Sequence, residues 1–334
     1  MYRSLLIAPL LALAACSDKA TDDTGSGTAT NPDACTVSVD STLPTDGAAD
    51  AYYRGNIEFI LSEPDATATI ETTIPGTQIT SEDGLRVIWQ LSAPLDSGAS
   101  YSATLHYCGG DPEITFTTSS LGTALENPDD LIGSAYVVDL TAARIVEPPG
   151  IGAVLSSYLT TDILIGVTAI SGANIEMMGA IAVEDSSPPT QDYCTSSIDF
   201  PPADFAEAPF FEIGPQDTTL SVAGYEIDIE SLLINGTFAA NGEYFDGGVL
   251  SGTIDTRPLA PLLDDSGNEG AICDLAINFG AACIPCPSDG EPFCLTLVAD
   301  QIYAEKVDGV TLYPITVGDC PGCDQAGFDP GTCE

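Results

Sequence analysis

Short runs in which apolar and polar residues alternate restrict the fold of this chain more than any other feature. The clearest is residues 225–230, where Tyr225, Ile227 and Ile229 alternate with three acidic residues. Successive side chains of a β-strand point to opposite faces, so such a run predicts a strand with one buried and one wet face. The sequence therefore predicts an all-β, mainly antiparallel protein.

Five further runs of this kind lie within residues 35–119. They cover residues 57–61, 66–72, 85–91, 101–107 and 114–118. Turn residues separate them, because Asp83-Gly84 is a hairpin signal and prolines such as Pro64 and Pro94 interrupt the chain elsewhere. Several short strands at this spacing predict a small β-sandwich.

The same region carries short words that are specific in combination. They read PTDGA at 44–48, IEF at 57–59, SEP at 62–64, PL at 94–95, GASY at 98–101 and ITFTT at 114–118. With these words the region resembles the bacterial Ig-like domain of S-layer and other surface proteins. The resemblance implies an Ig-like sandwich that serves as a spacer, stalk or adhesive module without catalytic residues. Cys35 and Cys108 depart from the common pattern of that family.

Residues 121–334 form the second predicted domain, an antiparallel β-rich domain with minor helix, disulfide-bonded, and either a sandwich or a partly closed barrel. Its strands are expected at 135–140, 162–170, 225–230 and 249–254, and its helices at 151–159 and 271–279. Hairpins are expected at Asn241-Gly242 and at Asp308-Gly309, the second joining residues 302–307 to 310–315.

A segment rich in proline and phenylalanine, residues 187–215, lies between predicted strands. Its phenylalanines are Phe200, Phe205, Phe210 and Phe211. A loop of this length needs a role. The favoured interpretation is a segment pinned by Cys194 and packed over the core, and the alternative is a lid over an apolar cavity in the sheet.

Residues 1–15 predict a secretory signal peptide. Arg3 is positively charged, residues 5–13 are apolar but too short to span a membrane, and small residues follow. The word LAAC, which ends at Cys16, resembles the lipobox of bacterial lipoproteins. This resemblance implies that Cys16 is acylated, becomes the new N-terminus and anchors the chain to a membrane.

The residues after Cys16 indicate where the anchored protein resides. Residues 16–34 are small and polar, so they are expected to form a flexible tether. In the sorting pattern of lipoproteins, Ser17 favours the outer membrane over the inner one. We therefore expect an extracytoplasmic location in the cell envelope, with a surface protein or polysaccharide as partner.

The chain is strongly acidic, with fifty Asp and Glu, seven Lys and Arg, and a formal net charge of −43. Nucleic acid is excluded as a partner, because binding it depends on Lys and Arg. The acidic residues are interpreted as a solvated surface that keeps the protein soluble, and the alternative is that some of them bind calcium. Residues 264–269 resemble the first half of an EF-hand loop, but Gly is missing at the sixth position and Leu275 stands where Glu should close it. No metal or other cofactor is therefore predicted.

Ten cysteines remain after Cys16, an even number that fits disulfides in an oxidising compartment. Cys35 and Cys108 are predicted to pair, since the others all lie in the second half. The pairing of the remaining eight is left open: Cys194, Cys273, Cys283, Cys286, Cys294, Cys320, Cys323 and Cys333.

Two CxxC motifs occur among these cysteines, at 283–286 and 320–323. In a reducing cytosol they would indicate a zinc site or a redox active site. Exported thiols oxidise, and no βαβ pattern surrounds either motif, so structural disulfides are the favoured interpretation.

Catalysis finds little support in the sequence. The chain has one histidine, His106, and lacks the GxSxG, HExxH, GxGxxG and P-loop motifs. The predicted function is therefore a lipid-anchored cell-envelope surface protein that acts as a non-enzymatic binding, adhesion or structural module. The first alternative is a carrier of a hydrophobic ligand in the second domain, and the second is a carboxylate-dependent hydrolase. A large apolar cavity would favour the carrier and a filled core the scaffold.

Overall fold

The computed structural model describes residues 35–140, 142–148, 162–184, 186–222, 225–263, 267–316, 320–323 and 328–332. The signal peptide, Cys16, the tether after it, the helix expected at 151–159 and Cys333 lie outside these residues. Residues 37–334 form one compact unit that contains two main hydrophobic cores. Within the described part, no helix is long and apolar enough to cross a membrane.

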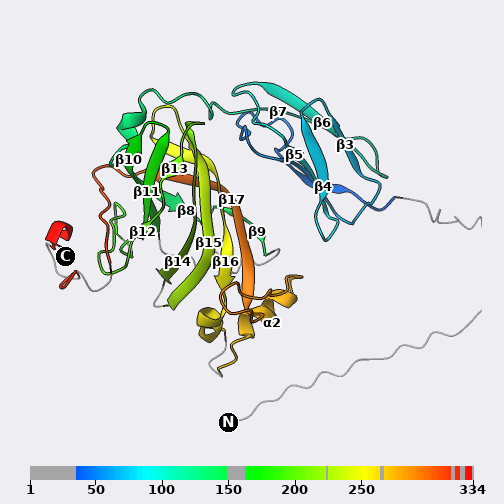
Figure 1. The fold of residues 1–334 in the computed structure, drawn as a ribbon. Coiled ribbons are helices and arrows are strands. Elements are labelled where there is room, and N and C mark those ends of the chain that lie inside the picture. The colour runs from blue at the N-terminus through cyan, green and yellow to red at the C-terminus, as the bar shows by residue number, and fades with distance from the viewer. Residues whose placement is uncertain are drawn as a thin grey trace, which may run out of the picture. The chain divides into compact units, whose positions relative to one another are not determined.

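Seven antiparallel strands surround the first core and form two sheets (Figure 1). They are β1 (Val39–Leu43), β2 (Ile57–Leu61), β3 (Thr69–Thr72), β4 (Gly76–Thr80), β5 (Arg86–Leu91), β6 (Ser100–His106) and β7 (Glu113–Thr117). One sheet has the order β1-β2-β5-β4 and the other β3-β6-β7. This is the strand arrangement of a constant-type immunoglobulin domain, so the Ig-like sandwich is confirmed.

Tyr101 gives this sandwich a second immunoglobulin feature. It lies at the start of β6, and its hydroxyl accepts a hydrogen bond of 2.9 Å from the backbone amide of Asp96. Its ring packs on Phe116 with 5.9 Å between centroids. A tyrosine at this corner, bonded to backbone a few residues upstream, ties the sixth strand of Ig-like folds to the preceding connection.

The second core lies inside a nearly closed antiparallel barrel. Its strands are β8 (Ala135–Asp139), β9 (Arg144–Glu147), β10 (Ile163–Ser171), β11 (Asn174–Ile181), β12 (Ile198–Asp199), β13 (Ala203–Asp204), β14 (Phe210–Val222), β15 (Tyr225–Phe238), β16 (Tyr244–Asp255) and β17 (Cys294–Lys306). They run in the order β12-β11-β10-β8-β17-β16-β15-β14, while β13 pairs with β11 and β9 with β17. The partly closed barrel is therefore the correct one of the two predicted alternatives.

Short helices complete the described chain. They are the α-helix α2 (Ala271–Ile277) and the 3₁₀ helices η1 (Pro128–Leu131), η2 (Arg257–Leu262) and η3 (Pro330–Thr332). The helix expected at 271–279 is thus confirmed.

The prediction of a hairpin at Asp308-Gly309 is wrong. Gly309 does turn with a φ of +75°, but residues 310–316 form no strand. The backbone of Tyr313 instead bonds to the buried side chain of Gln191, at 2.8 Å through both its amide and its carbonyl. Because a side chain satisfies the backbone of this segment, it lies against the 191–197 segment rather than returning along β17.

The interpretation of residues 187–215 as core packing is confirmed, although their description as a loop is partly wrong. The segment contains β12, β13 and the start of β14. Phe200, Phe205 and Phe211 are buried in the barrel core, and Cys194 is bonded to Cys323. That disulfide spans 129 residues, so in the chain-entropy account it contributes about 5 kcal/mol.

Four aromatic rings form the centre of the barrel core. Phe211 and Phe238 lie 4.8 Å apart, and both pack against Phe245. Tyr136, fully buried beside them, donates a 2.8 Å hydrogen bond to the carbonyl of Gly242. This bond fixes the expected Asn241-Gly242 turn, where Gly242 has a φ of +70°.

The sandwich and the barrel are joined by polar contacts as well as by the chain. The hydroxyl of Tyr52 lies 2.8 Å from that of Thr237, which is fully buried on β15. Gly247 on β16 faces the Tyr52 ring so closely that a Cβ there would lie 2.3 Å from it. Arg54 pairs with Glu207 and stacks 3.9 Å over the ring of Phe210.

Glu58 is the most enclosed charge at this joint, with a side chain only 4% exposed. Arg86 on β5 and Arg144 on β9 both reach its carboxylate at 3.0 Å, and Arg144 also binds Asp300 on β17. Burial by itself would raise the pKa of Glu58, but the hydrogen bonds and charges of Arg144 and Arg86 outweigh it and lower the pKa. The ionised carboxylate therefore links the sandwich to the barrel.

This arrangement predicts an acid-sensitive joint. A lowered pKa in the folded state stabilises the fold above the ordinary value near 4.5, and that stability is lost as the pH falls through the folded pKa. Glu58→Gln should lower the free energy of unfolding at pH 7 by about 2 kcal/mol. Because the variant has no carboxylate to protonate at this position, its free energy of unfolding should fall less than that of the wild type as the pH drops below about 4.5. Denaturant unfolding between pH 3 and pH 7 measures both effects. Glu212→Gln, on an exposed position of β14, is the control, and an equal decline in both variants would contradict the assignment.

Candidate functional site

A groove with a volume of about 880 Å³ lies along the seam of the barrel. The seam separates β12 and β14, the two strands at the ends of the barrel sheet (Figure 1). Residues 194–198 form one side of the groove and residues 216–219 the other. We call this hollow the seam groove.

Five carboxylates line the seam groove: Asp217, Glu226, Asp228, Glu230 and Asp255. No lysine or arginine is among its described lining residues. Three of these carboxylates accept hydrogen bonds of 2.6–3.1 Å from the protein itself. Asp217 accepts one from the amide of Ser231, Asp228 one from the hydroxyl of Thr219, and Glu230 one from the amide of Ser288. The groove is therefore strongly negative along its length.

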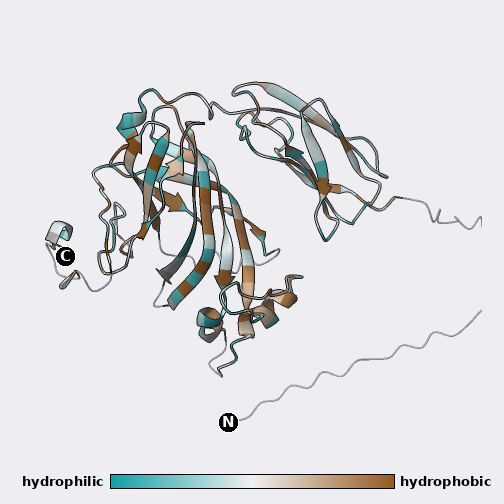
Figure 2. Ribbon diagram, in the orientation of Figure 1, coloured by the Kyte–Doolittle hydropathy of each residue, from teal (hydrophilic) through white to brown (hydrophobic). Residues whose placement is uncertain are grey.

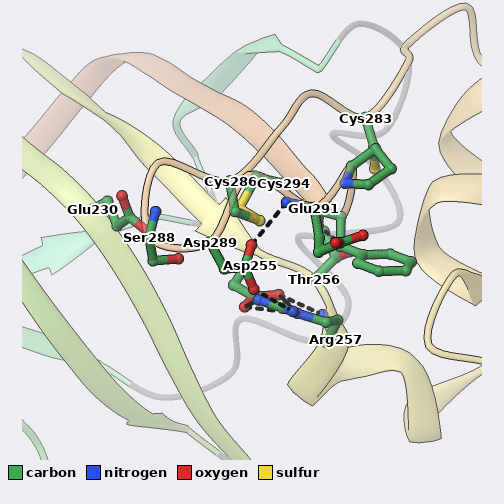
Figure 3. Close-up of a disulfide and its surroundings, with 12 residues drawn as sticks. Glu230, Asp255, Thr256, Arg257, Cys283, Cys286, Ser288, Asp289, Glu291 and Cys294 are labelled. Atoms are coloured by element: carbon green, nitrogen blue, oxygen red, sulfur yellow. Dashed lines mark hydrogen bonds and ion pairs between the residues drawn. A yellow bond between two sulfur atoms is a disulfide. The ribbon is translucent and has the colours of Figure 1, made fainter.

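One end of the seam groove is braced by a disulfide (Figure 3). Arg257 pairs with Asp255 and with Asp289, and the hydrogen bonds to these two carboxylates raise the pKa of its guanidinium. Asp255, Cys286 and Cys294 lie as close as metal ligands, within 4.8 Å of one another. Both sulfurs are bonded to each other, so this cluster offers no thiolate to a metal.

A small apolar cavity of about 110 Å³ lies inside the barrel. Eighteen residues line it, all aliphatic, phenylalanine or glycine: Val138, Leu140, Ile145, Ile163, Ile165, Gly179, Ile198, Phe200, Ile227, Ile229, Leu232, Ile234, Phe245, Leu250, Ile254, Leu297, Ala299 and Ile302. Ile198 and Ile229 belong to the walls of both the cavity and the seam groove. The two hollows therefore adjoin.

Strand alternation explains why an apolar cavity and an acidic groove lie side by side. Figure 2 shows apolar and polar residues alternating along β15. Ile227 and Ile229 face the interior, while Glu226, Asp228 and Glu230 occupy the intervening positions. The run that predicted a half-buried strand thus contributes to both walls.

A second cleft, of about 460 Å³, lies where the sandwich meets the barrel. Its lining includes Asp50, Asp246 and Asp300. Burial raises the pKa of Asp246, the Gly247 amide opposes this by a hydrogen bond, and the charge of Asp50 raises it further. We call this hollow the joint cleft.

His106 lies between two carboxylates. It lies on β6, with Nδ1 2.7 Å from Asp111 and Nε2 2.9 Å from Glu71. The hydrogen bond to Asp111, followed by that to Glu71, raises the pKa of His106. Both ring nitrogens therefore have a carboxylate partner within the sandwich.

The cysteines form disulfides in a pattern that excludes the redox use of the two CxxC motifs. Cys283 is bonded to Cys273 and Cys286 to Cys294, while Cys323 is bonded to Cys194. Cys35, Cys108 and Cys320 are also disulfide-bonded. Because Cys286 is bonded to Cys294 and Cys323 to Cys194, neither CxxC motif forms the internal disulfide that a CxxC active site requires. These bonds indicate folding in an oxidising, extracytoplasmic compartment.

Sequence reasoning missed the seam groove. It singled out Cys194 and the 225–230 run but had no signal that would bring them together, because segments 194–198, 216–219 and 226–230 meet only through barrel closure. The candidate calcium word at 264–269 lies partly outside the described residues.

Comparison with known proteins adds no relative: no protein-family model matches this chain, and no curated protein matches it.

The disulfide assignment predicts few free thiols. Nine of the eleven cysteines are disulfide-bonded, and because disulfides use cysteines in pairs, the denatured, unreduced protein should react with Ellman's reagent at no more than one thiol per chain. Reduction before denaturation is the positive control. A count of two or more without reductant would contradict the assignment.

Proposed function

We propose that this protein is a lipid-anchored cell-envelope protein whose barrel is a non-enzymatic binding module presented on an Ig-like stalk. The observation that carries the proposal is the seam groove, which is open, strongly charged and adjoins an apolar cavity. A few polar groups beside an apolar hollow are the usual composition of a ligand site.

The joint supports the role of the sandwich as a stalk. A module on a loose linker samples many orientations, whereas Glu58, Arg144 and Asp300 connect sandwich and barrel through charge-assisted hydrogen bonds. Ala239 and Tyr244, from the end of the β15–β16 hairpin, also pack into the sandwich core. These contacts support a stalk that is tied to the binding module by more than the connecting chain.

The carrier alternative would need more room than the interior of the barrel provides. Sites that enclose a whole small molecule have volumes of about 300–1,000 Å³. The interior cavity measures about 110 Å³. The interior therefore suits a fragment of a ligand rather than a whole lipid, which favours a binding module over a carrier.

The anchor is tested at Cys16. Cys16→Ala removes the acylated residue, so the protein should move from the membrane fraction to the soluble fraction and lose incorporation of labelled fatty acid. Ser17→Ala is the matched control and should stay membrane-bound. Retention of the Cys16→Ala protein in the membrane would contradict the lipid anchor.

Binding is tested with the released Cys16→Ala chain. It should co-sediment with envelope fragments, and the fraction bound should fall as the ionic strength rises, because the groove is charged. A chain that binds no envelope component at any salt concentration would contradict the binding module.

The hydrolase alternative rests on Asp246 in the joint cleft, since two neighbouring carboxylates of which one has a raised pKa can act as acid and base. Our proposal predicts no turnover of chromogenic esters or glycosides above that of the Asp246→Asn variant. A rate that depends on Asp246 and disappears in the variant would favour the hydrolase instead.

A further inference from the structure

The adjoining hollows of the barrel differ sharply in chemistry. The interior cavity is lined only by hydrocarbon side chains and glycine, and the seam groove carries five carboxylates. Ile198 and Ile229 lie in both walls. A ligand that fills both hollows therefore has an apolar end and a charged end.

The size of the cavity limits the apolar end. Its volume of about 110 Å³ is smaller than the engineered cavity of about 150 Å³ that binds benzene. It therefore accommodates a hydrocarbon group of no more than about six carbons. No polar atom of the lining would bind a head group inside, so the polar part of the ligand stays in the groove.

The charges of the groove determine the sign of the head group. An anionic head such as a carboxylate would be repelled by Glu226, Asp228 and Glu230, and a protonated amine would be attracted. Arg257 is already paired with Asp255 and Asp289, so it does not neutralise the other groove carboxylates.

A bare divalent cation fits this groove less well than an amine does. Among the described residues, the only group with three acidic or sulfur ligand atoms within 4.8 Å contains the disulfide-bonded Cys286 and Cys294. The groove carboxylates are dispersed along its walls instead of converging on one point, as oxygen ligands of calcium do.

We propose that the barrel binds a cationic amphiphile, a molecule with a short alkyl end in the interior cavity and a protonated amine in the seam groove. The proposal rests on the proposed binding function and names the ligand class for that site.

The first experiment uses three probes with the same chain, namely hexylammonium, hexanoate and hexanol, titrated calorimetrically into the full chain carrying Cys16→Ala. Hexylammonium should bind at least about tenfold more tightly than hexanoate at low salt, and the difference should shrink at about 1 M salt. Affinity should rise from butylammonium to hexylammonium and then level off, because longer chains exceed the cavity. Equal affinity for the three head groups would overturn the proposal, as would a gain that continues unchanged to decylammonium.

Two variants locate the ends of the ligand. Gly179 lines the cavity, and a Cβ there would meet only ordinary contacts, the nearest being 3.5 Å from Phe200. Gly179→Val therefore fills the cavity and should weaken all three probes about equally. Replacing Glu226 by Gln and Asp228 by Asn should weaken hexylammonium alone. The same change at Glu176 and Glu212, exposed acids outside the groove, should leave all affinities unchanged.

The outcomes separate this inference from the binding function. If no alkylammonium binds but the released chain still co-sediments with envelope fragments, the ligand class is wrong and the binding module stands. If neither binds, both are wrong. Should Gly179→Val fail to fold, the chain-length series and the Glu226 and Asp228 variant still decide between the outcomes.

Discussion

The scarcity of positive charge shapes this structure more than any other constraint. Fifty acidic residues face seven Lys and Arg, and the described part of the chain holds only Arg54, Arg86, Arg144, Arg257 and Lys306. Three of these five cations lie at the joint, where they bind Glu58, Asp300 and Glu207. A buried carboxylate is tolerable only with such partners, because an unpaired one would cost several kcal/mol. The few cations thus hold two acidic bodies together that would otherwise repel each other.

The fold was predictable where one strand face is buried and the other wet. The runs that became β3, β6, β7 and the start of β15 show this pattern clearly. Strands β1 and β4 lie at the edges of their sheet with hardly a buried residue, so they carry no apolar signal. For residues 310–315 the prediction of a strand was wrong for the opposite reason. Their side chains alternate, but the amides of Tyr313 and Ile315 bond to the side chains of Gln191 and Ser197 rather than to a neighbouring strand.

The site was far less predictable than the fold. Glu58 reads as the wet position of an alternating strand, yet it is 3% exposed because the barrel supplies Arg144 from 86 residues away. The seam groove likewise depends on closure, since eight strands must pair in one order before residues 194–198 face residues 216–219. The composition indicates an acidic surface, but which carboxylates lie beside the interior cavity depends on how the strands pair in the barrel. Disulfide pairing has the same character, because Cys194 finds Cys323 only through the folded barrel.

The gathering of five carboxylates at the seam is difficult to explain as a stabilising feature. Like charges along β15 repel one another, and among the described arginines Arg257 pairs with one seam carboxylate, Asp255, while Arg54, Arg86 and Arg144 pair with acids outside the groove. The seam is also where the barrel lacks a continuous ladder of hydrogen bonds, so it is the place where repulsion weakens the fold most. A bound cation would relieve that repulsion in the folded state alone and so stabilise the barrel by mass action. The placement of these carboxylates therefore fits selection for a ligand better than selection for stability.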